Sequence, residues 1–187
     1  GIALAATASL GAAQRPPAPA DVAAAVRAYR VAHEQPIIQE LVDLLAIPNI
    51  ASDEPNIRRN ADRLRAMLER RGFGVQFFEV PKRGPIIFGD LSAPGAARTV
   101  VFYAHYDGQP TDPKAWTGTS PFEPGLRTNS IEAGGALRPF PGAGTPYEDD
   151  WRIYARSASD DKSPIVALLA AVDALAAKGI ARAVNLR

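Results

Sequence analysis

The sequence contains no cysteine and only two histidines in 187 residues. The absence of cysteine excludes disulfide bonds, thiolate metal ligands and a cysteine nucleophile. An excess of charge is also missing, because 21 basic residues face 20 acidic ones and give a formal net charge of +1. We therefore expect no nucleic-acid partner and no anionic membrane partner. A hydrophobic content of 47% with 22% charged residues is ordinary for one globular domain.

The chain opens with an apolar stretch of small residues at 2–13, followed by a proline-rich segment at 14–20. The apolar stretch is too short to cross a bilayer and is typical of the hydrophobic region of a secretory signal. Two interpretations stay open for residues 1–20: a signal-peptide remnant of a periplasmic or secreted protein, or a disordered leader of an otherwise cytoplasmic one. In both, we expect residues 21–187 to form the domain.

Apolar spacing predicts helices in the first part of this domain and strands after it. The first helical region follows Asp21, a candidate N-cap, and Pro36 marks a break or kink in it. A second helix has an apolar stripe that includes Ile57 and Leu64. Three short apolar runs then predict strands at 75–80, 85–90 and 99–104. The last of these runs is almost continuously hydrophobic, which favours a central strand that is covered on both faces.

Residues 108–151 are loop-like, with an additional excursion at 131–147, and residues 151–154 read as a short strand. An apolar helix follows, for which Ser163 is the expected N-cap and Pro164 the first helical residue. These alternating elements indicate an α/β fold.

Two segments carry the candidate chemistry. The strand predicted at 99–104 ends in His105-x-Asp107, and an Asp160-Asp161 pair precedes the last helix. Imidazole and carboxylate are ligands that zinc prefers. Asp107 lies two residues along an extended chain, so it can accept from the second ring nitrogen of His105 and orient the ring for catalysis. Taken alone, His105 could equally be a hydrogen-bonded histidine at a strand end, and the Asp-Asp pair an Asx turn that caps a helix.

The two segments together resemble the M20 family of co-catalytic zinc peptidases. That family has a strand that ends in His-x-Asp, then a tryptophan and a Pro-Phe pair, and a Gly-Arg-Gly-x-x-Asp-Asp-Lys-Gly run at the next helix. The sequence departs from this pattern where the family usually has glycine, at Ala155, Ser157 and Ser163. It matches at His105, Asp107, Trp116, Pro121, Phe122, Arg156, Asp160, Asp161 and Lys162.

The resemblance implies a zinc-exopeptidase-like catalytic domain, which is an α/β fold with a mixed central sheet flanked by helices, incomplete at its C-terminus. It implies two Zn²⁺ ions in the complete enzyme, with His105 as one ligand and Asp160 as the carboxylate that both ions share. Asp161 would orient the turn across a cis peptide bond. The general base and the remaining ligands would come from positions beyond Arg187, after a strand that begins at 183–187. The fragment would then bind zinc weakly and be inactive alone.

The implied activity is hydrolysis of peptide bonds in short peptides, as an exopeptidase or dipeptidase. An amino-acid deacylase and a non-catalytic binding module that uses the long loop are the alternatives. The family also implies a homodimer formed through a downstream domain. We interpret Arg156 and Lys162 as salt-bridge partners that position the turn. Trp116 and Phe122 are interpreted as residues that pack the loop, with pocket lining as the alternative.

Overall fold

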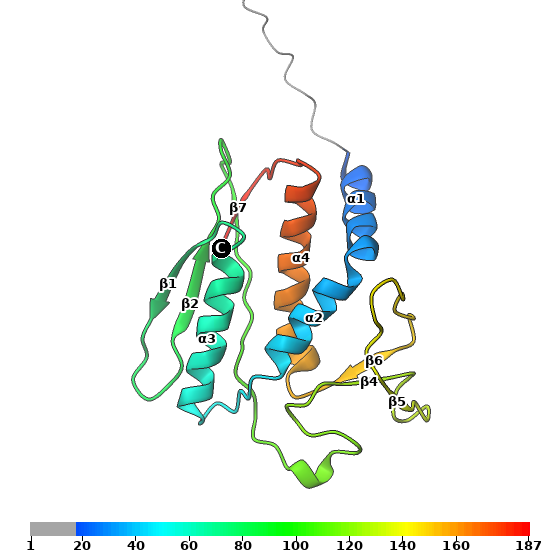
Figure 1. Cartoon of the computed structure of the whole chain (residues 1–187). Helices are drawn as coiled ribbons and strands as arrows, with labels where there is room; N and C mark the ends of the chain where they lie inside the picture. Colours follow the sequence, from blue (N-terminus) through cyan, green and yellow to red (C-terminus); the bar gives the residue numbers. More distant parts are fainter. Residues whose placement is uncertain (1–17) are drawn as a thin grey trace, which may run out of the picture.

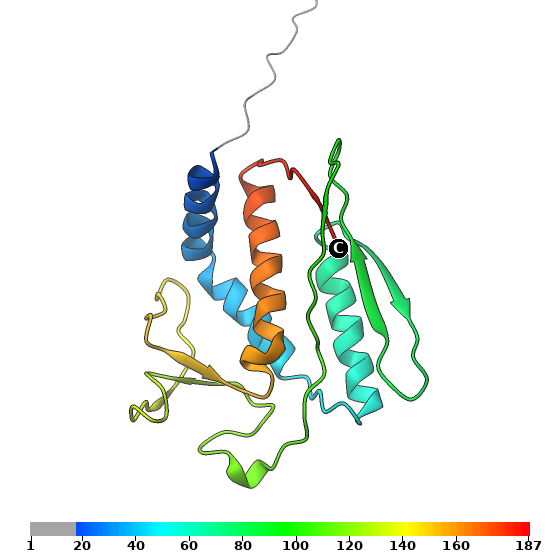
Figure 2. The ribbon, with the colours of Figure 1, turned by 180° about the vertical axis from the view of Figure 1, so that it is seen from behind.

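Three helices lie together on one side of the molecule: α1 (Pro19–Ala32), α2 (Glu34–Leu45) and α4 (Ser163–Ala177) (Figures 1 and 2). The computed structural model describes residues 18–187, so the predicted leader lies outside the described residues except for its last three positions. None of the helices within this range has the length and apolar character of a membrane span. The core between the helices is built from fully buried leucines, including Leu44, Leu45 and Leu169. Each such side chain contributes roughly 2 kcal/mol by leaving water.

The helix boundaries differ from the predicted ones by a few residues. The break between α1 and α2 falls at His33. Pro36 lies in the first turn of α2, where backbone N–H groups have no partner within the helix, so proline is tolerated there. Helix α1 begins at Pro19, so Asp21 lies in its first turn and is not the N-cap. Helix α4 begins at Ser163 itself, and no side chain caps it. The expected Ser163 cap is therefore wrong.

Helix α3 (Glu54–Glu69) and a β-hairpin form the other side of the molecule (Figure 1). The hairpin pairs β1 (Gly74–Phe78) with β2 (Ile86–Asp90) in antiparallel register. Helix and hairpin are joined through Phe77, since the Arg65 guanidinium carbon lies 3.5 Å from the centre of its ring. This contact is a cation–π interaction between the two elements.

The predicted central sheet is not formed among the described residues, where the strands pair into three small sheets. Of the run predicted as a covered central strand, only β3 (Thr99–Val100) is paired, in parallel with β7 (Asn185–Leu186). Val101 and Tyr103 are 72% and 88% exposed. The apolar pattern predicted burial on both faces, but within residues 18–187 no further strand pairs with this segment. The architecture is thus mixed α/β with fragmented sheets.

The region predicted as a long loop contains two strands. Strands β4 (Gly125–Arg127) and β5 (Leu137–Arg138) form an antiparallel sheet with β6 (Arg152–Tyr154), in the order β5-β4-β6. The buried Arg127 stabilises it by donating to the carbonyls of Gly135 (2.8 Å) and Thr117 (2.6 Å). The short strands carry too few alternating residues for a strand signal in the sequence.

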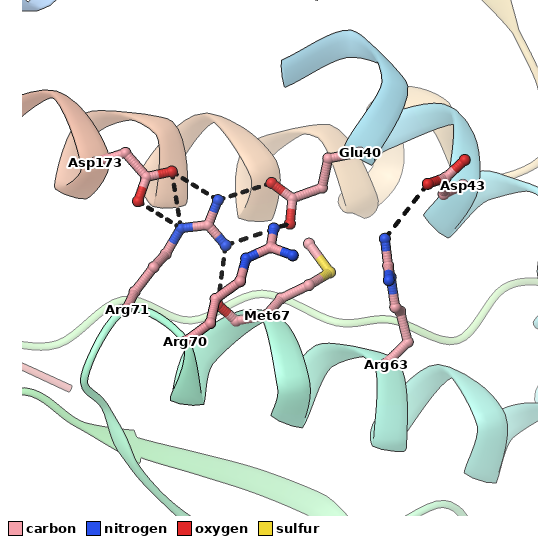
Figure 3. A network of polar contacts seen from close by, with 7 residues as sticks. All are labelled: Glu40, Asp43, Arg63, Met67, Arg70, Arg71 and Asp173. Atoms are coloured by element: carbon pink, nitrogen blue, oxygen red, sulfur yellow. Dashed lines mark hydrogen bonds and ion pairs between the residues drawn. The ribbon is translucent and has the colours of Figure 1, made fainter. Parts of the chain in front are cut away.

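A network of ion pairs joins helices α2, α3 and α4 (Figure 3). Arg71, which follows α3, donates to Glu40 on α2 (2.7 Å) and to Asp173 on α4 (2.7 Å). The Arg71 and Glu40 side chains are only 6% and 9% exposed, and Arg70 also pairs with Glu40. The three helices are thereby held in fixed relation to one another.

Candidate functional site

The structure brings His105 and Asp160 into direct contact. His105 lies in the extended segment that follows β3, and Asp160 lies in the turn at Ala158–Lys162, before α4. The His105 Nε2 atom is 2.8 Å from Asp160 Oδ1. The His105 and Asp160 side chains are 37% and 85% exposed, so a solute can reach both. Two residues that are 55 positions apart in sequence therefore present a nitrogen and an oxygen side by side, where both are accessible to a metal ion.

Asp107 holds the second nitrogen of the His105 ring. His105 Nδ1 lies 3.0 Å from the Asp107 backbone oxygen and 3.2 Å from its Oδ1 atom. Both ring nitrogens thus face oxygen acceptors, Nδ1 those of Asp107 and Nε2 that of Asp160, so the doubly protonated ring satisfies both contacts. If a cation took the place of the Nε2 proton, Asp107 would keep the remaining proton on Nδ1. The sequence predicted the carboxylate as the acceptor, and the structure adds the backbone carbonyl as the shorter contact.

The Asp160–Asp161 peptide bond is cis, as the resemblance implied. Asp161 accepts from the backbone N–H of His105 through Oδ2, at 3.3 Å. The two carboxylates of the pair therefore contact the same residue in different ways. Asp160 contacts the His105 ring, and Asp161 holds the His105 backbone.

Lys162 and Arg156 position the turn through backbone carbonyls, and the described residues show no salt bridge for either. Lys162 is fully buried, and its Nζ donates to Leu44 O (2.8 Å) and Ile47 O (3.1 Å) at the end of α2. Burial lowers the pKa of Lys162 to about 7. Arg156 donates to Pro110 O at 2.7 Å. The predicted salt bridges are wrong because backbone carbonyls at a helix end and in a loop act as the acceptors.

A cavity of about 790 Å³ opens at the His105–Asp160 pair. Trp116 lines it, which favours the pocket alternative for this residue, whereas Phe122 is half-buried and is not among the lining residues. Trp151 also lines the cavity, and the Arg138 guanidinium carbon lies 3.4 Å from its ring centre. No pattern in the sequence marked Trp151 as a lining residue, because its position depends on contacts between segments that are distant in the sequence.

The hydrogen bond to Asp160 raises the pKa of His105, and the contacts with Asp107 act in the same direction against partial burial. A raised pKa means that the proton competes with a metal ion for Nε2 up to a higher pH than in a free histidine.

The donor set fits one zinc ion in part. A neutral imidazole nitrogen and a carboxylate oxygen suit zinc, and two such ligands in tetrahedral geometry lie about 3.3 Å apart. The His105–Asp160 separation of 2.8 Å needs to widen by about half an ångström to admit the ion. Within residues 18–187 no group of three or more histidine, cysteine or acidic side chains is placed to hold a metal. His105 and Asp160 are therefore two candidate ligands, one fewer than a catalytic zinc ion ordinarily takes.

Comparison with known proteins identifies relatives of this chain. No family model matches the sequence. The sequence is 26% identical over 162 residues to the Cys-Gly metallodipeptidase dug1 of Schizosaccharomyces pombe, a match that covers 80% of this chain and 29% of the relative. The chain thus spans less than a third of the length of this curated relative.

Solved structures agree with this comparison. The dipeptidase Dug1p from Saccharomyces cerevisiae superposes with a TM-score of 0.67 at 23% identity, covering 87% of this chain and 33% of that one. The M20 family metallo-carboxypeptidase Sso-CP2 from Sulfolobus solfataricus gives a TM-score of 0.60 at 27% identity, covering 80% and 29%. By sequence and by fold, the chain is homologous to the M20 family of metallopeptidases over about a third of their length.

Proposed function

We propose that this chain supplies His105 and Asp160 as ligands of a zinc centre that hydrolyses peptide bonds in short peptides. The observation that carries the proposal is the 2.8 Å contact between His105 Nε2 and Asp160 Oδ1 at the mouth of the cavity. The homology to metallodipeptidases supports metal dependence and a peptide substrate.

Each residue of the site has a separate task in this proposal. His105 would bind through Nε2 once that nitrogen gives up the proton it shares with Asp160, while Asp107 keeps the other proton on Nδ1. Asp160 presents two oxygens, and a carboxylate with two free oxygens can be shared between two cations. Zinc, when bound, polarises a scissile carbonyl and lowers the pKa of a coordinated water.

The cavity explains how a small peptide is accommodated beside these ligands. Trp116 and Trp151 provide apolar surface in its wall, and aromatic rings bury a large area of a bound side chain. Arg138 and Tyr147 both contact the Trp151 ring and keep it in place. The wall is therefore preformed, which lowers the entropic cost of binding.

Zinc titration of the chain followed by NMR tests the metal-binding part of the proposal. The chain has two histidines, and His33 is exposed at the α1–α2 junction, so its ring serves as an internal control. We expect zinc to shift the His105 ring signals, with weak affinity, and to leave those of His33 unchanged. An Asp160→Ala variant should lose this shift. Equal shifts at both rings, or none at His105, would contradict the proposal.

The hydrolytic part is tested with the longest form of the protein that the gene encodes. We expect it to release free amino acids from dipeptides in the presence of zinc, and the His105→Ala variant to release none. Release from N-acetylated amino acids but not from dipeptides would identify a deacylase instead. Unchanged dipeptide hydrolysis in the variant would show that His105 is not a ligand.

A further inference from the structure

Asn49 lies between the two segments that carry the candidate ligands. It follows α2 and is completely buried. Its Nδ2 atom donates to the carbonyl of Tyr106 (2.8 Å), next to His105, and to Oγ of Ser157 (3.0 Å), at the start of the turn that carries Asp160. Both protons of the amide are thus used, one on each segment. Because the Tyr106 carbonyl can only accept, the amide nitrogen must face it.

The backbone around Asn49 makes the same connection. Gly108 N–H donates to Asn49 O at 2.7 Å, and Ala51 N–H donates to Gly108 O at 3.0 Å. A Cβ atom at Gly108 would lie 2.9 Å from Ser157 Oγ and 3.2 Å from Asn49 Oδ1. A side chain at position 108 would therefore force Ser157 or Asn49 to shift.

Ser157 shows that this contact constrains the turn. Its φ angle is +62°, in the left-handed region that favours glycine over residues with side chains. The hydroxyl of Ser157 accepts from Asn49, and its carbonyl accepts from Lys162 N–H at 3.1 Å, which closes the turn around Asp160. A hydrogen bond to Ser157 thus acts on the base of the turn that presents the carboxylate.

We propose that Asn49 is a positioning residue that sets the separation between His105 and Asp160. This inference rests on the proposed zinc function, since the role of Asn49 is to keep the two ligand segments close enough for one ion to bind both. Asn49 contacts neither ligand side chain. It acts on the backbone beside His105 and, through Ser157, on the turn that holds Asp160. Loss of a group that orients metal ligands typically weakens metal binding by about 10-fold to 100-fold.

Two variants separate this role from a general contribution to stability. Ser157→Gly removes the hydroxyl that accepts from Asn49 and also relieves the left-handed backbone, so it should fold well. Asn49→Ala removes both bonds at once. Asn60→Ala is the matched control, because Asn60 is equally buried and its Nδ2 also makes two hydrogen bonds, to the carbonyls of Pro48 and Asn56 at 2.8 Å each, and none to the segments that carry His105 and Asp160.

Two measurements are made on the whole chain. The zinc dissociation constant is taken from the His105 ring shift, and exchange of the His105 amide, which donates to Asp161, is followed without metal. We expect Ser157→Gly and Asn49→Ala to raise the dissociation constant by about tenfold and to speed His105 amide exchange. Asn60→Ala should lose stability and change neither quantity.

The outcomes separate this inference from the zinc proposal. If wild type binds zinc at His105 and Ser157→Gly leaves either quantity unchanged, the positioning role is refuted and the zinc proposal stands. If wild type binds no zinc at His105, the zinc proposal fails. The amide exchange then decides alone: faster exchange in Ser157→Gly supports the link between the segments, and unchanged exchange refutes it.

Discussion

Replacement of Lys162 with methionine should change how the stability of the chain depends on pH. Burial lowers the pKa of Lys162 from 10.5 to about 7, so between these values the unfolded state binds a proton that the folded state does not. The free energy of unfolding of the wild type therefore rises with pH in this window, by about 1.4 kcal/mol per unit. From pH 7.5 to 9.5 the gain is about 2.5 kcal/mol. The carbonyls of Leu44 and Ile47 stabilise the ammonium, which makes this value an upper one.

The assay is urea denaturation of wild type and Lys162→Met at the two pH values. The lost hydrogen bonds cost the variant the same at both, so they cancel in the double difference. Wild type should gain stability relative to the variant on going from pH 7.5 to 9.5. Lys178→Met is the control, because Lys178 is exposed and its replacement should leave the pH dependence unchanged. Parallel curves for wild type and Lys162→Met, within about 0.5 kcal/mol, would refute the reasoning.

Two further predictions concern charged pairs. Glu40→Gln should lower the free energy of unfolding by about 3 kcal/mol, because it leaves the buried Arg71 with one carboxylate. The control is Glu79→Gln on the exposed surface, which should cost under about 0.5 kcal/mol. Equal losses for the two variants in urea denaturation would show that burial does not set the size of the effect. Asp160→Asn should lower the pKa of His105 measured by NMR titration, since the hydrogen bond to Asp160 is the main cause of its raised value. A raised folded-state pKa adds stability that is complete below the unfolded-state pKa near 6.5 and is lost as the pH rises through the folded-state pKa. The free energy of unfolding of the wild type should therefore exceed that of Asp160→Asn by more at pH 5.5 than at pH 8. A difference between the two proteins that does not change with pH would contradict this.

The resemblance to the M20 family implied the convergence of His105 and Asp160, because the sequence has both motifs of that family in the same order. One follows an apolar run, and the other precedes an apolar helix with Pro164 in its first turn. Side chains at the end of a strand and at the start of a helix meet on one side of an α/β fold. The order of the two motifs thus carried most of the information about the pair.

Asn49 and Trp151 could not be predicted, because their roles depend on contacts between segments that are far apart in sequence. Asn49 stands in an irregular segment after a helix, where an asparagine ordinarily indicates a turn. The prediction of a covered central strand for the run after Val100 was wrong for another reason. Hydrophobic composition indicates that a segment favours burial, but within residues 18–187 no second strand covers this run.

The segment at 103–104 lies between two residues whose backbones are hydrogen-bonded, Phe102 and His105. Val100 and Phe102 exchange backbone hydrogen bonds with Arg187, and His105 N–H bonds to Asp161, but within residues 18–187 the amides of Tyr103 and Ala104 bond to nothing. Such a span can flex without breaking a bond at either anchor. In the zinc proposal, the widening of the His105–Asp160 pair would be absorbed in this span and would leave the helical core undisturbed.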